Sequence, residues 1–166
     1  MRHENSVFHQ VLKHVPWDTF DRLVEDHKAD HRVRRLTTKT RFLALLFGQL
    51  SGSVSLREIE GGLASQSARL YHAGGRCVAR ATLADANRTR PAAVFADLFA
   101  HMAARAGRRT RRHIKDAVRI LDATRIEVCS LSGGWADMVK GHLAVKLHVA
   151  YDPVANAPLA MTLTGQ

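Results

Sequence analysis

The sequence predicts an α+β fold in which a helical N-terminal half is followed by an antiparallel sheet. Residues 5–107 carry apolar positions at helical spacing, separated by capping residues and by Pro and Gly. Residues 143–151 instead alternate between apolar and other side chains, which is typical of a strand with one buried face. We therefore expect a helical domain over residues 1–107, a basic linker over 108–116 and three antiparallel strands within 117–166.

The 166 residues carry a formal net charge of +10 at pH 7, and 46% of them are hydrophobic. This apolar content is enough to form a core and excludes a wholly disordered chain. The excess of positive charge favours a polyanionic partner, either nucleic acid or an acidic membrane surface. An inert basic surface is the alternative.

Several classes of protein are disfavoured. The longest apolar run, Phe42–Phe47, is too short to span a bilayer, and the N-terminus has no apolar signal-peptide segment. Cys77 and Cys129 form no Cys-x-x-Cys motif, which argues against a disulfide scaffold or zinc ribbon and suits a reducing cytoplasm. His27 and His31 have helical spacing but no third ligand nearby, so solvated histidines are the simpler interpretation.

The central helix of the N-terminal half is expected to begin at Thr37 or Thr38 and to end at Ser51-Gly52-Ser53. Its predicted inner face is wide and apolar, and comprises Phe42, Leu43, Leu46, Phe47 and Leu50. Ser55 and Glu58 form a capping box that opens the next helix, which Gly61-Gly62 should keep short.

A further helix is predicted from about Thr82 to Arg90. Together with the helix that Ser55 opens, it suits a helix-turn-helix-like DNA reader, although the loop between the two is longer than the usual tight turn. The alternative is an ordinary helix with a solvated basic face. The predicted DNA-binding residues of this region are Arg80, Asn87, Arg88 and Arg90.

Pro91 suits the first turn of the following helix, which Gly107 is expected to close. The densest basic run of the chain comes next and has no apolar periodicity. It predicts a linker that lies on DNA phosphates, where each neutralised phosphate makes binding more sensitive to salt. A linker that only improves solubility is the alternative. The predicted phosphate contacts are Arg108, Arg109, Arg111 and Arg112.

The last part of the chain begins with a short apolar strand that is expected to end at Asp122. Residues 125–131 could form a further short strand, and residues 143–151 and 158–164 form a hairpin about a turn at Asp152-Pro153 and Asn156. By itself, a carboxylate at a strand end is more simply a cap for the N–H groups of the next turn.

Two sets of motifs, taken in order, resemble bacterial DDE-type transposases of the "insertion sequence four" family. The N-terminal set comprises Ser6-Val7-Phe8, the helix at 43–50, Ser55–Ile59, Arg69–His72 and Ala79–Asn87. The second set comprises Leu121–Thr124, Trp135-Ala136, Lys140-Gly141 and Val145–His148, and resembles the start of that family's catalytic domain.

The resemblance implies a ribonuclease-H-like sheet in which Asp122 is the first catalytic carboxylate and binds Mg²⁺ or Mn²⁺. Two such ions would promote strand cleavage and joining, and they require several hard oxygen ligands. Thr124 and Lys146 would support Asp122 or contact phosphate. The implied partners are double-stranded DNA at the terminal inverted repeats and another copy of the chain or a full-length transposase, without a membrane.

The second Asp of that family should follow a fourth strand and the Glu should lie on a later helix, both beyond Gln166. The expectation is therefore a C-terminally truncated transposase that binds DNA and is inactive alone, with residues 117–166 marginally stable and residues 1–107 able to fold. The alternative is a non-catalytic DNA-binding regulator that competes with a complete transposase for the same DNA ends.

Overall fold

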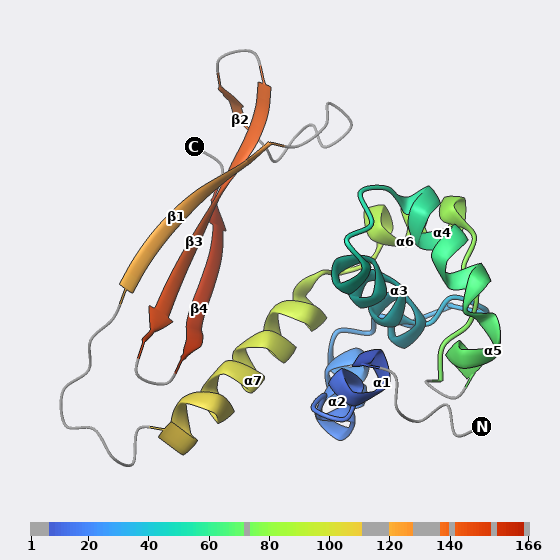
Figure 1. The fold of residues 1–166 in the computed structure, drawn as a ribbon, viewed down its shortest axis with the longest axis horizontal. Coiled ribbons are helices and arrows are strands. Elements are labelled where there is room, and N and C mark those ends of the chain that lie inside the picture. The colour runs from blue at the N-terminus through green and yellow to red at the C-terminus, as the bar shows by residue number, and fades with distance from the viewer. Residues whose placement is uncertain are drawn as a thin grey trace. The chain divides into compact units, whose positions relative to one another are not determined.

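A computed structural model describes residues 7–71, 74–110, 120–127, 137–139, 142–153 and 156–164. Within them, helices precede strands, which confirms the predicted α+β class (Figure 1). None of the described helices combines the length and the hydrophobicity that crossing a membrane requires. The elements are α1 (Val7–Leu12), α2 (Trp17–Asp26), α3 (Thr38–Ser51), α4 (Leu56–Ser65), α5 (Ser67–Leu70), α6 (Arg80–Thr89), α7 (Ala93–Thr110), β1 (Ile120–Glu127), β2 (Asp137–Val139), β3 (His142–Asp152) and β4 (Ala157–Thr164).

The chain divides into two compact units, Met1–Leu98 and Phe99–Gln166. The division falls inside α7. This helix does not stop at Gly107, as the sequence predicts, but continues to Thr110. Arg108 and Arg109 therefore belong to a helix and not to an irregular linker. A glycine weakens a helix by only about 1 kcal/mol relative to alanine, so one glycine near the end of a long helix need not terminate it.

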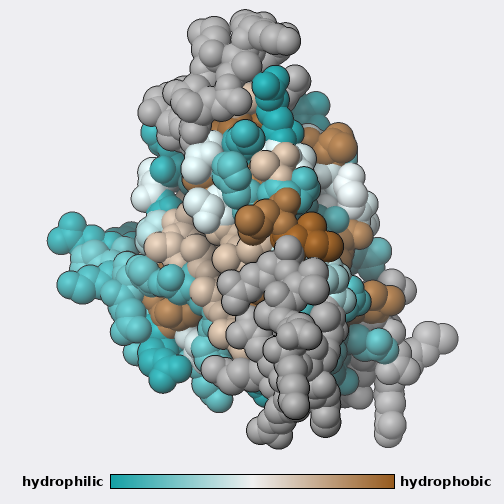
Figure 2. Space-filling model, turned by 90° about the vertical axis from the view of Figure 1, so that its left-hand side faces the viewer, coloured by the Kyte–Doolittle hydropathy of each residue, from teal (hydrophilic) through white to brown (hydrophobic). Residues whose placement is uncertain are grey.

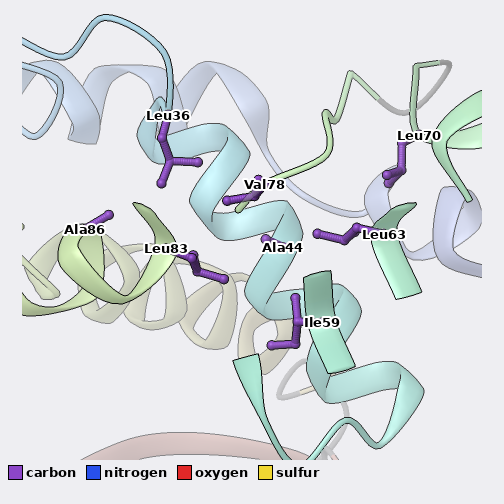
Figure 3. Packing of buried hydrophobic residues seen from close by; sticks show 8 residues of the cluster. All are labelled: Leu36, Ala44, Ile59, Leu63, Leu70, Val78, Leu83 and Ala86. Carbon is purple, nitrogen blue, oxygen red and sulfur yellow. The ribbon is translucent and has the colours of Figure 1, made fainter. Parts of the chain in front are cut away.

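Helix α3 is the centre of the helical unit, as the sequence predicts. The Thr37 side chain caps it by accepting a hydrogen bond from the Thr40 N–H at 3.2 Å, and Gly52 ends it in the left-handed conformation with φ of 68°. Helices α3 to α6 and the adjoining loops contribute residues to a hydrophobic cluster around α3 (Figure 3). Its buried members are Leu36, Ala44, Ile59, Leu63, Leu70, Val78, Leu83 and Ala86.

Helices α3 and α4 pack closely because each presents a glycine to the other. A Cβ atom on Gly48 would lie 2.5 Å from Cδ1 of Ile59, and one on Gly62 would lie 2.7 Å from Cε1 of Phe47. Contacts this short do not occur between ordinary carbon atoms, so both positions favour glycine. Helix α4 is ten residues long and buries Ile59 and Leu63, which agrees with the short helix that the sequence predicts.

A second cluster, of aromatic rings, joins α2, α3 and the start of α7. Phe20 is fully buried, and its ring centroid lies 5.6 Å from that of Trp17 and 5.4 Å from that of Phe42. Phe42 also meets Phe95 at 5.9 Å. Leu50, a member of the predicted inner face of α3, is instead 53% exposed.

The sheet contains three long strands and the short strand β2. Strand β3 is central, with antiparallel partners β1 and β4, and β2 pairs with its beginning. The prediction that the first strand ends at Asp122 is wrong: β1 runs unbroken from Ile120 to Glu127, with Asp122 opposite Val149. Pairing with β3 extends the strand, which local sequence alone did not indicate.

The two faces of the sheet follow from this register, since residues directly opposite each other in an antiparallel pair share a face. The Asp122 face comprises Ile120, Asp122, Thr124 and Ile126 of β1, Val145, Leu147, Val149 and Tyr151 of β3, and Met161 and Leu163 of β4. The Lys146 face comprises Leu121, Ala123, Arg125 and Glu127 of β1, Ala144, Lys146, His148 and Ala150 of β3, and Ala160, Thr162 and Thr164 of β4.

Large apolar side chains of the sheet remain accessible to solvent. Leu121 is 81% exposed on the Lys146 face, and Met161 and Leu163 are 50% and 55% exposed on the Asp122 face. Hydrophobic residues also reach the surface in the view of Figure 2, beside strongly hydrophilic ones. The sheet therefore buries much less of its apolar surface than the helical unit does.

Candidate nucleic-acid interface

The first turns of α4 and α6 border an open groove of about 740 Å³ in the helical unit. The two helices that the sequence predicts as a DNA reader are thus brought together, and they contact each other. The groove is lined by Ser55, Leu56, Arg57 and Glu58 from the start of α4, and by Arg80, Ala81 and Ala84 from α6.

The capping box at the start of α4 determines which charges of the groove are free. The Ser55 hydroxyl accepts a hydrogen bond from the Glu58 N–H at 3.2 Å, and the Glu58 carboxylate accepts one from the Val54 N–H at 2.9 Å. The negative charge of Glu58 is therefore engaged by the cap, whereas Arg57 and Arg80 are exposed beside it. Arg57 is not among the residues predicted from the sequence, although its place within the capping box puts it in the first turn of α4.

Helix α6 exposes small and basic side chains. Arg80 stands in its first turn, and Ala81 and Ala84 are exposed next to it. One to two turns further on, the Arg88 guanidinium forms an ion pair with the Asp85 carboxylate at 2.7 Å. Alanine side chains allow a flat surface to approach a helix closely, and arginine donates hydrogen bonds to phosphate or to guanine.

The two other residues predicted on α6 are engaged within the unit. The Asn87 side-chain oxygen accepts a hydrogen bond from Nε of Arg41 at 2.8 Å. Arg90 donates to the Leu36 carbonyl, and its guanidinium lies 4.0 Å from the Asp30 carboxylate. These contacts hold the end of α6 against the start of α3, so the exposed residues of α6 are better placed than Asn87 and Arg90 to reach a ligand.

Arg41, the donor to Asn87, is not among the residues predicted from the sequence. It is only 4% exposed, lies 5.0 Å from the centre of the Phe95 ring, and also donates to the Pro91 carbonyl at 3.4 Å. Burial lowers the pKa of its guanidinium, and the charge of nearby Arg90 lowers it further. The position of Arg41 immediately before the apolar run Phe42–Phe47 could have identified it, because a charged residue within a core helix requires buried partners.

The basic run after α7 is described only in part. The backbone of Arg108 and Arg109 belongs to α7, while Arg111 and Arg112 lie outside the described residues. Their predicted contacts with phosphate stay predictions.

In the sheet unit, Asp122 is exposed on β1, and the Thr124 hydroxyl donates a hydrogen bond to its carboxylate at 3.3 Å. Lys146 lies on the opposite face, across from Arg125, so it does not share a site with Asp122. Within the described residues, no group of three His, Cys, Asp or Glu side chains converges as a metal site would require. Asp122 and Thr124 alone do not fit a two-metal centre.

The chain is similar to known proteins over part of its length. Residues 3–76, which include α1 to α5, match a family described as a domain of unknown function, DUF4372. A protein named "Putative transposase y4zB" from Sinorhizobium fredii is 40% identical over 82 residues, which are 49% of this chain and 23% of that protein. The chain thus spans about a quarter of the length of this curated relative, and it is transposase-like over about half of its own. No solved structure matches the chain.

Proposed function

We propose that this chain is the DNA-binding part of a transposase, and that its helical unit binds DNA through the α4–α6 groove. The observation that carries the proposal is the convergence of two helix starts, with Arg57 and Arg80 exposed in one groove, in a chain of net charge +10. Helix α6 would enter the major groove, with Ala81 and Ala84 against the bases or sugars and Arg88 within reach of a base edge. The partial similarity to a transposase supports this assignment.

The expected target is double-stranded DNA at the ends of a mobile element. Arg57 and Arg80 would contact phosphates, which position the protein, and the α6 surface would supply sequence preference. Asn87 and Arg90 would act indirectly, by holding α6 through Arg41 and the loop before α3.

In a complete transposase of the DDE type, Asp122 would be one of several carboxylates that bind Mg²⁺ or Mn²⁺, which activate the attacking hydroxyl and stabilise the leaving oxygen. The exposure of Asp122 and the orientation given by Thr124 support this assignment. The described residues alone do not hold such ions, so no catalytic step is assigned to them.

The test is duplex binding by the Arg57→Gln/Arg80→Gln double variant, measured by fluorescence anisotropy over a series of salt concentrations. Loss of two phosphate contacts should reduce the slope of log K against log salt by about 2. The matched control is Lys13→Gln/Arg22→Gln, which removes two exposed charges from outside the groove and should leave most of the slope intact. Equal slopes for the two double variants would exclude the groove as the DNA site.

Sequence preference is measured separately, with the Arg88→Ala variant and two duplexes, one from the ends of the element and one random. The variant should lose preference for the element ends by roughly tenfold, about 1–3 kcal/mol, if Arg88 reads a base. An equal loss on both duplexes would assign Arg88 to the phosphate backbone.

A further inference from the structure

Strand β1 forms one edge of the sheet, and β3 is its only partner among the described strands (Figure 1). The seven residues from Ile120 to Ile126 are all exposed to solvent, whichever face of the sheet they occupy. An edge strand presents a row of N–H and C=O groups that have no partner within its sheet, so it can pair with a further strand. Strand β1 therefore offers both free backbone groups and uncovered apolar side chains.

The opposite edge of the sheet, β4, is less suited to pairing. Pro158 lies in this strand, and the register of β3 and β4 shifts beside it, between Ala150 and Tyr151. Proline and irregular pairing both discourage the addition of a strand. Strand β1 contains no proline, and its pairing with β3 runs without a register shift. Charged side chains are thus the main obstacle that β1 presents to a further strand.

The positions of these charges restrict how β1 could pair with β1 of a second copy. Two copies joined in one antiparallel sheet are related by a two-fold axis perpendicular to it, so one residue lies opposite its own copy and sets the register. Centring the pair on Asp122 or on Arg125 would place like charges about 5 Å apart, which is destabilising. Centring it on Thr124 would place Asp122 opposite the apolar Ile126. All three registers are therefore disfavoured.

Centring the pair on Ala123 gives complementary neighbours on the Asp122 face. Ile120 then lies opposite Ile126 of the second copy, and Asp122 lies opposite Thr124 of the second copy. The Thr124 hydroxyl is already a donor to the Asp122 carboxylate within one chain, at 3.3 Å. The two Asp122 residues are only diagonal neighbours, about 7–8 Å apart, and a threonine faces each of them.

The same register gives complementary neighbours on the Lys146 face. Leu121, which is 81% exposed, lies opposite Arg125 of the second copy, whose aliphatic stem can cover an apolar side chain. Ala123 lies opposite its own copy at the axis, where its small side chain allows the strands to approach. No like charges are directly opposed among residues 120–126 in this register, so the strand is complementary to itself.

We propose that β1 binds β1 of a second copy of this chain, antiparallel and centred on Ala123, so that the two sheets join into one. The resemblance in sequence names another copy among the partners but no surface for it. The proposal does not rest on the proposed function, because none of its residues lines the α4–α6 groove and the pairing requires no DNA.

The experiment measures self-association of the whole chain by sedimentation equilibrium in the absence of DNA. One strand pair is a small interface, so the dissociation constant should lie between about 1 μM and 1 mM. Ala123→Arg places two positive charges opposite each other at the axis and should weaken the association by about tenfold. The matched control is Ala160→Arg, which adds the same charge at an exposed alanine of β4 and should change the association by no more than about twofold.

A second variant distinguishes a loss of pairing from a loss of folding. Ala123→Glu also places like charges opposite each other, whereas a mixture of Ala123→Arg and Ala123→Glu chains places opposite charges there. The mixture should therefore form a one-to-one heterodimer that is tighter than either homodimer. Misfolded chains would not recover on mixing, and an interface elsewhere on the molecule would not distinguish the mixture from its components.

Three results would overturn the proposal: a chain that stays monomeric up to about 1 mM, an equal loss of association in Ala160→Arg and Ala123→Arg, or a mixture without a preferred heterodimer. A monomeric chain that still binds duplex DNA refutes this proposal and leaves the proposed function intact. A chain that dimerises through β1 but binds no duplex refutes only the proposed function.

Discussion

The helical unit and the sheet unit differ in how fully they bury their apolar side chains and provide partners for their charged ones. In the helical unit, apolar residues such as Phe20 and Leu83 are buried, and even the buried Arg41 finds acceptors and an aromatic ring. In the sheet unit, Leu121 and Leu163 expose more than half of their surface. Since buried apolar area is the main source of folding stability, the helical unit should be the more stable of the two.

The two units also differ in which side chains point to a function. In the helical unit, Glu58, Arg88 and Arg90 have partners within the described residues. Arg57 and Arg80 are exposed beside them, which is why they are the proposed ligand contacts. In the sheet unit the informative feature is the strand register, which places Arg125 directly opposite Lys146 and puts Asp122 on the other face.

The largest effect is expected from Phe20→Ala, which empties a fully buried site between two other aromatic rings. Such a change lowers the free energy of unfolding by about 3–5 kcal/mol. Hydrogen–deuterium exchange should show lost protection in α2 and α3, with the strands unaffected. Equal loss of protection in β3 would contradict the division into two units.

Arg41→Ala should have the next largest effect, about 2–4 kcal/mol, because it leaves a cavity and deprives Asn87 of its donor. Thermal unfolding followed by circular dichroism at the helical signal measures it. Arg41→Met fills most of the same volume and is the matched variant. If Arg41 acts mainly by packing, Arg41→Met should be more stable than Arg41→Ala. If the hydrogen bonds of Arg41 also position α6, Arg41→Met should regain stability but still bind DNA weakly.

Smaller effects of opposite sign are expected at two glycines of the helical unit. Gly48→Ala should destabilise by about 1–3 kcal/mol, because the new methyl group meets Ile59. Gly61→Ala, in the interior of α4, places its methyl group in open space and should stabilise by about 0.5–1 kcal/mol. Chemical denaturation of the two variants measures both values, and a stabilising effect of Gly48→Ala would contradict the close contact between α3 and α4.

The smallest effects are expected in the sheet. Leu163→Ala and Asp122→Asn both replace exposed side chains and should change the free energy of unfolding by no more than about 0.5 kcal/mol. Exchange protection in β1 and β4 is the measurement. A loss above about 1 kcal/mol in Asp122→Asn would show that the carboxylate serves the fold, which would weaken its assignment as a metal ligand.

Which segments form helices and which form strands could be predicted from interactions between neighbouring residues. The Thr37 and Ser55 caps and the left-handed Gly52 depend only on neighbouring residues, and all three lie where the sequence predicts them. The alternation in β3 likewise follows from the two-residue period of a strand. The ends of elements were harder to predict. Helix α7 continues past Gly107 because one glycine costs little, and β1 continues past Asp122 because it pairs with β3.

The sequence by itself therefore determined the class of fold, the order of its elements and the basic character of the chain, since these depend on composition and on short-range periodicity. Tertiary structure alone decided which charges are buried and which share a surface. It placed Arg41 in the core, joined Arg57 to Arg80 in one groove, and put Lys146 on the face opposite Asp122. Each of these relations depends on strand register or helix packing between residues that are far apart in the sequence. A short-range sequence pattern does not specify which distant residues will meet.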